Sequence, residues 1–243
     1  MAGMGARDRL IVALDVPTIE QARGLVAKLG DAVGFYKIGL ELAMRGGLDL
    51  ARELARNQRR VFLDMKLLDI ENTVERATRN VAETGATFLT VHAHDLKTLR
   101  AAVAGKVGTQ LKILGVTVLT NLDAADLREQ GIDALPADLV ARRARLAQQA
   151  GCEGVVASGQ EAARVRAVVG PHMAIVTPGI RLPGDAAGDQ ARIATPEQAI
   201  AAGADYLVVG RPITAATDPT KATELFVQSI EAGLARRTRT ALG

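Results

Sequence analysis

The segment from residue 62 to residue 74, FLDMKLLDIENTV, carries charged side chains at a spacing that suits catalysis. It begins as an apolar run typical of a buried strand, in which successive side chains point to opposite faces. Asp64 and Lys66 should therefore share a face, with Asp69 in the following loop, where it can converge with them. Such a cluster can stabilise a developing charge and move a proton. The same spacing also occurs in surface ion pairs, but its position at a strand end favours catalysis.

The loop after this segment is expected to be fixed by the start of a helix. Asn72 and Glu75 stand three positions apart, which is the spacing of a capping box. In that motif each side chain accepts a hydrogen bond from the backbone amide of the other residue. The pair therefore predicts that the next helix opens near Asn72 and holds the loop that carries Asp69.

Polar residues also stand within or just past other short apolar runs. In barrels of parallel strands the active site forms where the strands end. The further residues selected in this way are Asp15, Lys37, His92, Thr120, Gly210 and Arg211. Gly210 and Arg211 follow the last run, where many barrels bind phosphate through backbone amides and an arginine, although a structural role for the pair is equally open.

His92 and His94 stand two residues apart and could share one face of a strand end. Two imidazoles can begin a metal site, but a zinc site needs further cysteine, histidine or carboxylate ligands. The sequence offers no cluster that completes such a set. We therefore expect no metal site and a packing role for the two histidines.

Short apolar runs alternate with longer segments of helical periodicity, which indicates parallel strands joined by helices. The predicted strands are 10–14, 35–38, 61–65, 88–92, 111–118, 154–157, 174–177 and 206–210. Predicted helices include 19–29, 48–57, 74–84, 139–150 and 160–169. This alternation over 243 residues predicts an α/β fold, a closed (β/α)8 TIM barrel that spans residues 1–243 as a single domain.

Two connections depart from the regular spacing. The gap between the fifth and sixth predicted strands is longer than those before it and predicts an extra helix. The segment 179–195 contains Pro183, Gly184 and Gly188 and has few apolar residues. Long connections in compact domains are usually lids or binding loops, so we predict a lid here, with a tolerated insertion as the alternative.

The composition excludes several classes of protein. With 48% hydrophobic and 23% charged residues, the chain is neither disordered nor fibrous. Its net charge of +3 comes from dispersed residues, and aromatic residues make up only 2%, which argues against a nucleic-acid surface. No apolar stretch approaches the roughly 18 residues of a membrane span, and the first ten residues lack a signal-peptide core. We expect a cytoplasmic protein without a membrane or nucleic-acid partner.

These residues, in this order, resemble the orotidine 5'-monophosphate decarboxylase family in its bacterial form. The resemblance covers nearly the whole chain and is carried by VALDV (12–16), FYKIGLEL (35–42), FLDMKLLDIENTV (62–74), TVHAH (90–94), GVTVLTNLD (115–123), TPGIRLPGDAAGDQARIATPEQAI (177–200) and YLVVGRPIT (206–214). DMKLLD alone is shared with related phosphate-sugar decarboxylases. Together with GDAAGDQ and VVGRPIT it is specific for the family.

The resemblance implies catalytic roles for the charged residues. Asp15 and Lys37 would hold the ribose hydroxyls of a nucleotide. Lys37 would also join Asp64, Lys66 and Asp69 in a catalytic array, with Lys66 as the proton donor.

It also implies a set of substrate-binding residues. Thr120 would contact the pyrimidine, and Gln190 in the lid would bridge the pyrimidine and the phosphate. Gly210 and Arg211 would bind the phosphate, and Arg181 would contribute from the same loop as Gln190.

In the family the residues that match Asp69 and Thr73 reach the site of a partner subunit, so the resemblance implies a homodimer. Two positions depart from the common family motif, because Leu68 replaces a histidine and Glu71 replaces a proline. Neither is a catalytic position in the family. The departures concern the packing of the loop rather than the reaction.

The activity implied is the conversion of orotidine 5'-monophosphate to UMP and CO2 in de novo pyrimidine biosynthesis, without a cofactor. Two alternatives remain open at this point. One is a Mg²⁺-dependent phosphate-sugar decarboxylase or aldolase of the same barrel group. The other is a non-catalytic module that binds a nucleotide.

Overall fold

Eight parallel strands close into a barrel in the computed structural model of the chain, which describes residues 4–184 and 193–242. The strands pair in chain order, and β8 returns to pair with β1. They are β1 (Leu10–Ala13), β2 (Phe35–Gly39), β3 (Arg60–Leu67), β4 (Phe88–His92), β5 (Lys112–Val116), β6 (Gly154–Val156), β7 (Ala174–Thr177) and β8 (Tyr206–Val209). The predicted (β/α)8 barrel is confirmed.

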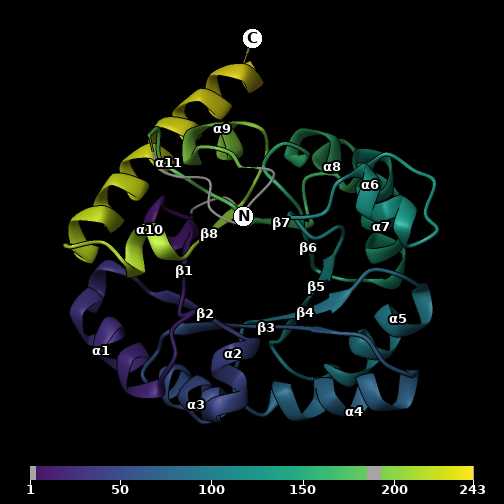
Figure 1. Cartoon of the computed structure of the whole chain (residues 1–243), viewed down its shortest axis with the longest axis horizontal. Coiled ribbons are helices and arrows are strands. Elements are labelled where there is room, and N and C mark those ends of the chain that lie inside the picture. Colours follow the sequence, from purple (N-terminus) through teal and green to yellow (C-terminus); the bar gives the residue numbers. More distant parts are fainter. Residues whose placement is uncertain (1–3, 185–192, 243) are drawn as a thin grey trace.

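Helices surround the barrel and connect its strands (Figure 1). They are α1 (Ile19–Leu29), α2 (Leu40–Leu42), α3 (Leu48–Arg56), α4 (Glu71–Ala82), α5 (Leu96–Gly105), α6 (Ala124–Glu129), α7 (Pro136–Ala150), α8 (Ala162–Val169), α9 (Pro196–Ala201), α10 (Arg211–Thr214) and α11 (Pro219–Leu242). The extra helix expected between the fifth and sixth strands is α6. Figure 1 shows α11 along one side of the molecule, at the yellow end of the colour scale.

The inside of the barrel is filled by side chains and is not a channel. Phe35, Phe62, Phe88 and Tyr206 pack together with ring centroids 5.2 to 5.9 Å apart. These are four of the six aromatic residues of the chain, which has four phenylalanines and two tyrosines. The large rings fill the lower part of the barrel, which leaves its upper part, toward the carboxyl ends of the strands, for a site.

A second, larger core lies between the strands and the helices. The outward faces of the strands supply mainly valine, leucine and isoleucine, and each helix turns an apolar stripe toward them. In α3, for example, Leu50, Ala51 and Leu54 are buried while the neighbouring charged side chains remain at the surface. Among the described residues no helix is long and apolar enough to cross a membrane.

Candidate active site

A cavity of about 420 Å³ opens at the carboxyl ends of the strands, where barrel enzymes carry their active sites. Its lining includes residues in or just after every strand except β4, and Phe62 from the aromatic layer contributes to it. The predicted site residues that line the cavity are Asp15, Lys37, Asp64, Lys66, Thr120, Arg181, Gly210 and Arg211. The strand-end criterion therefore selected residues that the fold brings together, with the exception of His92, which does not line the cavity. Arg181 was predicted from the family resemblance.

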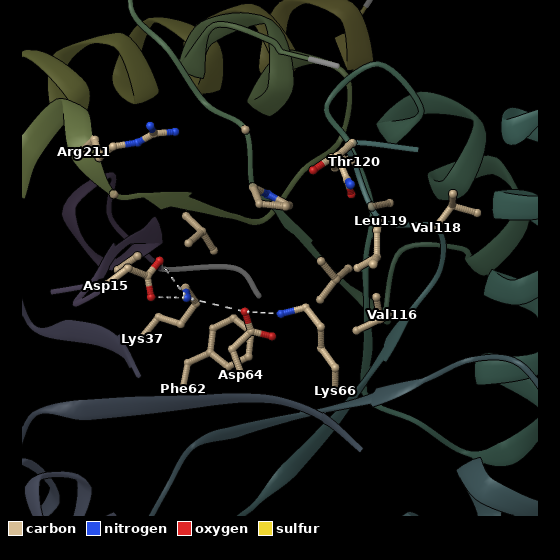
Figure 2. A pocket seen from close by; sticks show the side chains of 18 of the residues that line it. Asp15, Lys37, Phe62, Asp64, Lys66, Val116, Val118, Leu119, Thr120 and Arg211 are labelled. Carbon is tan, nitrogen blue, oxygen red and sulfur yellow. Dashed lines mark hydrogen bonds and ion pairs between the residues drawn. The ribbon is translucent and has the colours of Figure 1, made fainter. Parts of the chain in front are cut away.

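Four of these side chains form a row of alternating charge (Figure 2). Lys37 Nζ donates to Asp15 Oδ1 at 2.9 Å, and it lies 3.5 Å from Asp64 Oδ2. Lys66 Nζ lies 2.8 Å from the same Oδ2 atom. The order is carboxylate, ammonium, carboxylate, ammonium, and Asp64 lies between two cations.

The middle of the row is buried and its ends are accessible. The side chains of Lys37 and Asp64 are 9% and 14% exposed, whereas those of Lys66 and Asp15 are 29% and 51% exposed. A ligand in the cavity could therefore reach the Lys66 ammonium and the Asp15 carboxylate directly. The two central groups are more enclosed, although both also line the cavity.

The charges of the central pair stabilise each other. Burial acts to lower the pKa of Lys37, but the nearby carboxylates of Asp64 and Asp15 outweigh it and raise that pKa above its usual value. Burial acts to raise the pKa of Asp64, and the attraction of Lys37 and Lys66 outweighs it and lowers that pKa. Both groups are therefore charged at neutral pH.

The backbone at Lys66 is unusual for a residue with a side chain. Its φ angle is +49°, in the left-handed region that normally favours glycine. The register between β3 and β4 shifts between Leu63 and Leu67, so Lys66 lies in a bulge. Bulges re-aim side chains next to active sites, and this one directs the Lys66 ammonium toward Asp64.

Gly39 at the end of β2 leaves room for the row. A Cβ atom at this position would lie 2.8 Å from Asp15 Oδ1 and 3.1 Å from Lys37 Nζ. Any side chain there would displace the Asp15–Lys37 pair. The sequence contained a signal for this in FYKIGLEL, where the glycine directly ends a strand, but Gly39 was not among the predicted site residues.

The opposite side of the cavity carries Arg211 and Thr120 (Figure 2). Arg211 is the first residue of α10, and Gly210 is its N-cap. Backbone amides at the start of a helix attract anions, and an arginine adds a bidentate contact to phosphate. Arg181 also lines the cavity; it is buried and donates from Nη1 to the carbonyl of Ile180 at 2.8 Å. This end of the cavity suits an anion, whereas the row of charged side chains suits the stabilisation of charge and the transfer of a proton.

The predicted lid follows β7 and lines the cavity with its first residues. Gly179 and Arg181, together with Pro178 just before the segment, contribute to the lining, and a β-bridge joins Ile180 to Ala194 across the base of the segment. The predicted binding residue Gln190 lies outside the described residues. Its role stays a prediction.

Asp69 and Thr73 do not line the cavity of their own chain within the described residues. Both are exposed, and Asp69 Oδ1 accepts a hydrogen bond from the Ile70 amide at 2.7 Å. The expectation that Asp69 converges with Asp64 and Lys66 in one chain is wrong, because Asp69 is exposed and does not line the cavity that the other two residues line.

The predicted capping box of Asn72 and Glu75 is also wrong. Helix α4 begins at Glu71, so Asn72 already lies inside its first turn, and the N-cap is Ile70. Ile70 makes no capping hydrogen bond through its side chain. The Glu75 carboxylate instead accepts from Arg79 Nη2 at 2.7 Å, one helical turn further along.

His92 and His94 lie beside one another, with ring centroids 4.7 Å apart. Among the described residues no group of three or more histidine, cysteine, aspartate or glutamate side chains is placed to hold a metal ion. Burial, the neighbouring His94 and the Lys66 ammonium lower the pKa of His92 to about 4. His92 is therefore neutral at physiological pH.

Thr90 contacts the row but was not selected from the sequence. Its hydroxyl donates to Asp64 Oδ1 at 2.9 Å and accepts from the Lys66 amide at 2.9 Å. The alternation of strand side chains contained the signal, because Thr90 shares a face of β4 with Phe88, which packs inside the barrel. A polar residue on that face has to lie near the charged end of β3.

The fold and the site together define a TIM barrel whose strand-end cavity joins a row of alternating charge to an end that suits an anion. The chain belongs to the Orotidine 5'-phosphate decarboxylase / HUMPS family, whose model matches residues 8–226.

Individual relatives agree with this assignment. A protein from Afipia carboxidovorans named orotidine 5'-phosphate decarboxylase is 58% identical over 224 residues, which cover 92% of this chain and 95% of the relative. A protein of the same name from Methylorubrum extorquens is 57% identical over 226 residues, covering 93% and 96%. The crystal structure of orotidine 5'-phosphate decarboxylase from Lactobacillus acidophilus matches with a TM-score of 0.82 and 36% identity, over 92% of this chain and 99% of that one.

Proposed function

We propose that the chain decarboxylates orotidine 5'-monophosphate to UMP, a step of de novo pyrimidine biosynthesis, without a metal or cofactor. The observation that carries the proposal is the row Asp15, Lys37, Asp64 and Lys66 in the cavity of the barrel. Relatives 54% to 58% identical to the chain are named for this activity.

The cavity offers partners for each part of the substrate. Arg211 and the amide at Gly210 would bind the phosphate at one end, and Asp15 and Lys37 would bind the ribose hydroxyls. Thr120 lies on the side opposite the row, where it would contact the pyrimidine (Figure 2). This arrangement would place the reacting carbon of the ring beside Lys66.

Loss of CO2 leaves a carbanion at C6 of the pyrimidine, which no carbonyl in the ring is placed to stabilise as an ordinary electron sink. The Lys66 ammonium would stabilise this negative charge and then donate the proton that replaces the carboxylate. Its proximity to Asp64, at 2.8 Å, would hold the ammonium in place before the substrate arrives. Such preorganised charge needs no rearrangement as the reaction proceeds.

Repulsion between Asp64 and the substrate carboxylate would add to the effect but cannot be the main contribution. Two unit charges 4 Å apart interact by about 4 kcal/mol at an effective dielectric constant of 20. Enzymatic accelerations can require on the order of 20 kcal/mol. The phosphate, which does not react, would supply binding energy that closes the site and holds the substrate against the charged row.

We also propose that the chain is a homodimer in which Asp69 and Thr73 enter the site of the partner. Asp69 is flanked by Leu68 and Ile70, which are 51% and 73% exposed. Leu40 and Met44 follow the neighbouring strand β2 and are 48% and 80% exposed. Exposed apolar side chains that flank a charged residue suit a contact with a second copy.

The experiment that tests the activity is depletion of orotidine 5'-monophosphate, followed by absorbance, in excess EDTA. The proposal predicts turnover that EDTA does not affect. Activity toward sugar phosphates that EDTA abolishes would favour a Mg²⁺-dependent phosphate-sugar enzyme. Binding of UMP without release of CO2 would favour a non-catalytic module.

A cytoplasmic location stays a prediction.

A further inference from the structure

Thr90 lies where β3 and β4 lose their regular pairing. Leu63 pairs with Leu89 and Leu67 pairs with Val91, so three residues of β3 face Thr90 alone in β4. In a regular ladder the amide of each residue would have a backbone partner. Here the Lys66 amide instead donates to the Thr90 hydroxyl at 2.9 Å. The side chain of Thr90 therefore replaces a missing backbone acceptor.

The same hydroxyl fixes the carboxylate of Asp64. Its oxygen accepts from the Lys66 amide, and its proton points to Asp64 Oδ1 at 2.9 Å. The other carboxylate oxygen, Oδ2, lies between the ammonium groups of Lys37 and Lys66. Both oxygens of Asp64 are thus held, which sets the rotation of the carboxylate.

Two features make this contact important for Lys66. Its left-handed backbone is unfavourable for a residue with a Cβ atom and persists only where surrounding contacts hold it. Thr90 is fully buried, so water cannot take the place of the hydroxyl without a rearrangement. If the hydroxyl were removed, the Lys66 amide and Asp64 Oδ1 would each lose a buried partner.

We infer that Thr90 is a positioning residue, which holds the Lys66 backbone and the Asp64 carboxylate in the geometry that the reaction uses. Thr90 does not line the cavity among the described residues, so it would act through Lys66 and Asp64 and not by touching the substrate. This inference rests on the proposed function and goes beyond it by assigning a role to a residue of β4.

The test compares Thr90→Val, Thr90→Ala and Thr90→Ser with the wild type. Thr90→Val keeps the shape of the side chain and removes the hydroxyl, whereas Thr90→Ser keeps the hydroxyl. We expect Thr90→Val and Thr90→Ala to lower kcat by about 10- to 100-fold and to change the Kd for UMP by less than about threefold. Thr90→Ser should stay within about threefold of the wild type in both.

Thr177→Val is the matched control. Thr177 is also fully buried and lies in a barrel strand, but its hydroxyl has no hydrogen-bond partner within the part of the chain that the structure describes. The same substitution there should leave kcat unchanged within about threefold. A loss shared by both variants would point to general damage to the barrel and would overturn the inference.

A second readout does not depend on activity. The Lys66 amide hydrogen, measured by NMR hydrogen exchange, should exchange at least about tenfold faster in Thr90→Val than in the wild type. If Thr90→Val does not fold, Thr90→Ala against Thr90→Ser gives the same comparison. Unchanged exchange, an unchanged kcat, or a Thr90→Ser variant as slow as Thr90→Ala would each overturn the inference. A wild type that does not consume orotidine 5'-monophosphate would instead overturn the proposed function, and the exchange rates would still decide whether Thr90 holds Lys66.

Discussion

The Lys66 ammonium lies 2.8 Å from Asp64 Oδ2. Both residues lie in the part of β3 where the register with β4 shifts, and the φ angle of Lys66 is in the left-handed region. In a regular strand the Cβ atoms of the two residues would stand about 7 Å apart on one face, a gap that a lysine side chain can span. The left-handed angle at Lys66 is unfavourable for a residue with a Cβ atom, and such backbone conformations cluster at active sites.

The first prediction concerns the anion-binding end. Arg211→Ala should lower kcat as well as kcat/KM, by about 10- to 100-fold each, because binding energy from the phosphate is used in the chemical step. Steady-state kinetics with orotidine 5'-monophosphate measure both constants. Arg56→Ala, an exposed arginine at the end of α3, is the control and should behave like the wild type. A loss confined to KM in an assay limited by chemistry would contradict the account.

The second prediction concerns the shared site. Asp69→Ala and Lys66→Ala should each be nearly inactive alone. In a mixed dimer, one site would combine an intact Lys66 from one subunit with an intact Asp69 from the other. Random exchange of subunits should therefore restore up to about a quarter of the wild-type activity.

Subunit exchange has to be shown separately, for example with two affinity tags that co-purify only from mixed dimers. The control is a mixture of Asp64→Ala with Lys66→Ala. Both of these residues line the cavity of their own chain, so no intact site can form in that mixture. Exchange without any recovery of activity in the Asp69 mixture would show that the site lies within one chain.

Much of the fold could be predicted because its signals are local and repeated. The predicted strand 174–177 matches β7, and the predicted helix 19–29 matches α1. Apolar runs and helical periodicity define such elements without tertiary information. The alternation of side chains along the strand also predicted that Asp64 and Lys66 lie close together, but it did not predict the bulge in which they lie.

The remaining features depend on contacts between elements. A left-handed lysine is rare, so nothing in the local sequence indicates the bulge at Lys66. Helix α4 begins at Glu71 without a side-chain cap, so the side chain of Asn72 does not mark its start. Thr90 acquires its role only when β3 and β4 pair. Asp69 does not line the cavity of its own chain, and the role proposed for it requires a second subunit.

The third prediction concerns pH. The pKa of His92 is lowered to about 4 by burial, by His94 and by Lys66, with Arg143 also lowering it and Asp64 opposing. In the unfolded chain the value would be near 6.5. Between these two values the unfolded state binds more protons than the folded state, so folding stability should fall as pH falls through this window.

The chain has three histidines, which makes NMR titration of the ring protons a direct measurement. The His92 signal, assigned by its loss in His92→Asn, should titrate near pH 4. The same variant should weaken the pH dependence of stability between pH 6.5 and 4. A His92 that titrates at 6.5 or above would show that its ring is hydrated or paired with a carboxylate.

The central claim is that the Lys66 ammonium stabilises the carbanion and supplies the proton, and Lys66→Ala tests it most directly. Lys97, which is 83% exposed on α5, provides the control variant Lys97→Ala. The measurement is consumption of orotidine 5'-monophosphate in excess EDTA, with UMP binding measured on the same samples. The account predicts that Lys66→Ala still binds UMP but has no detectable turnover, while Lys97→Ala matches the wild type. Turnover by Lys66→Ala within about tenfold of the wild type would contradict it.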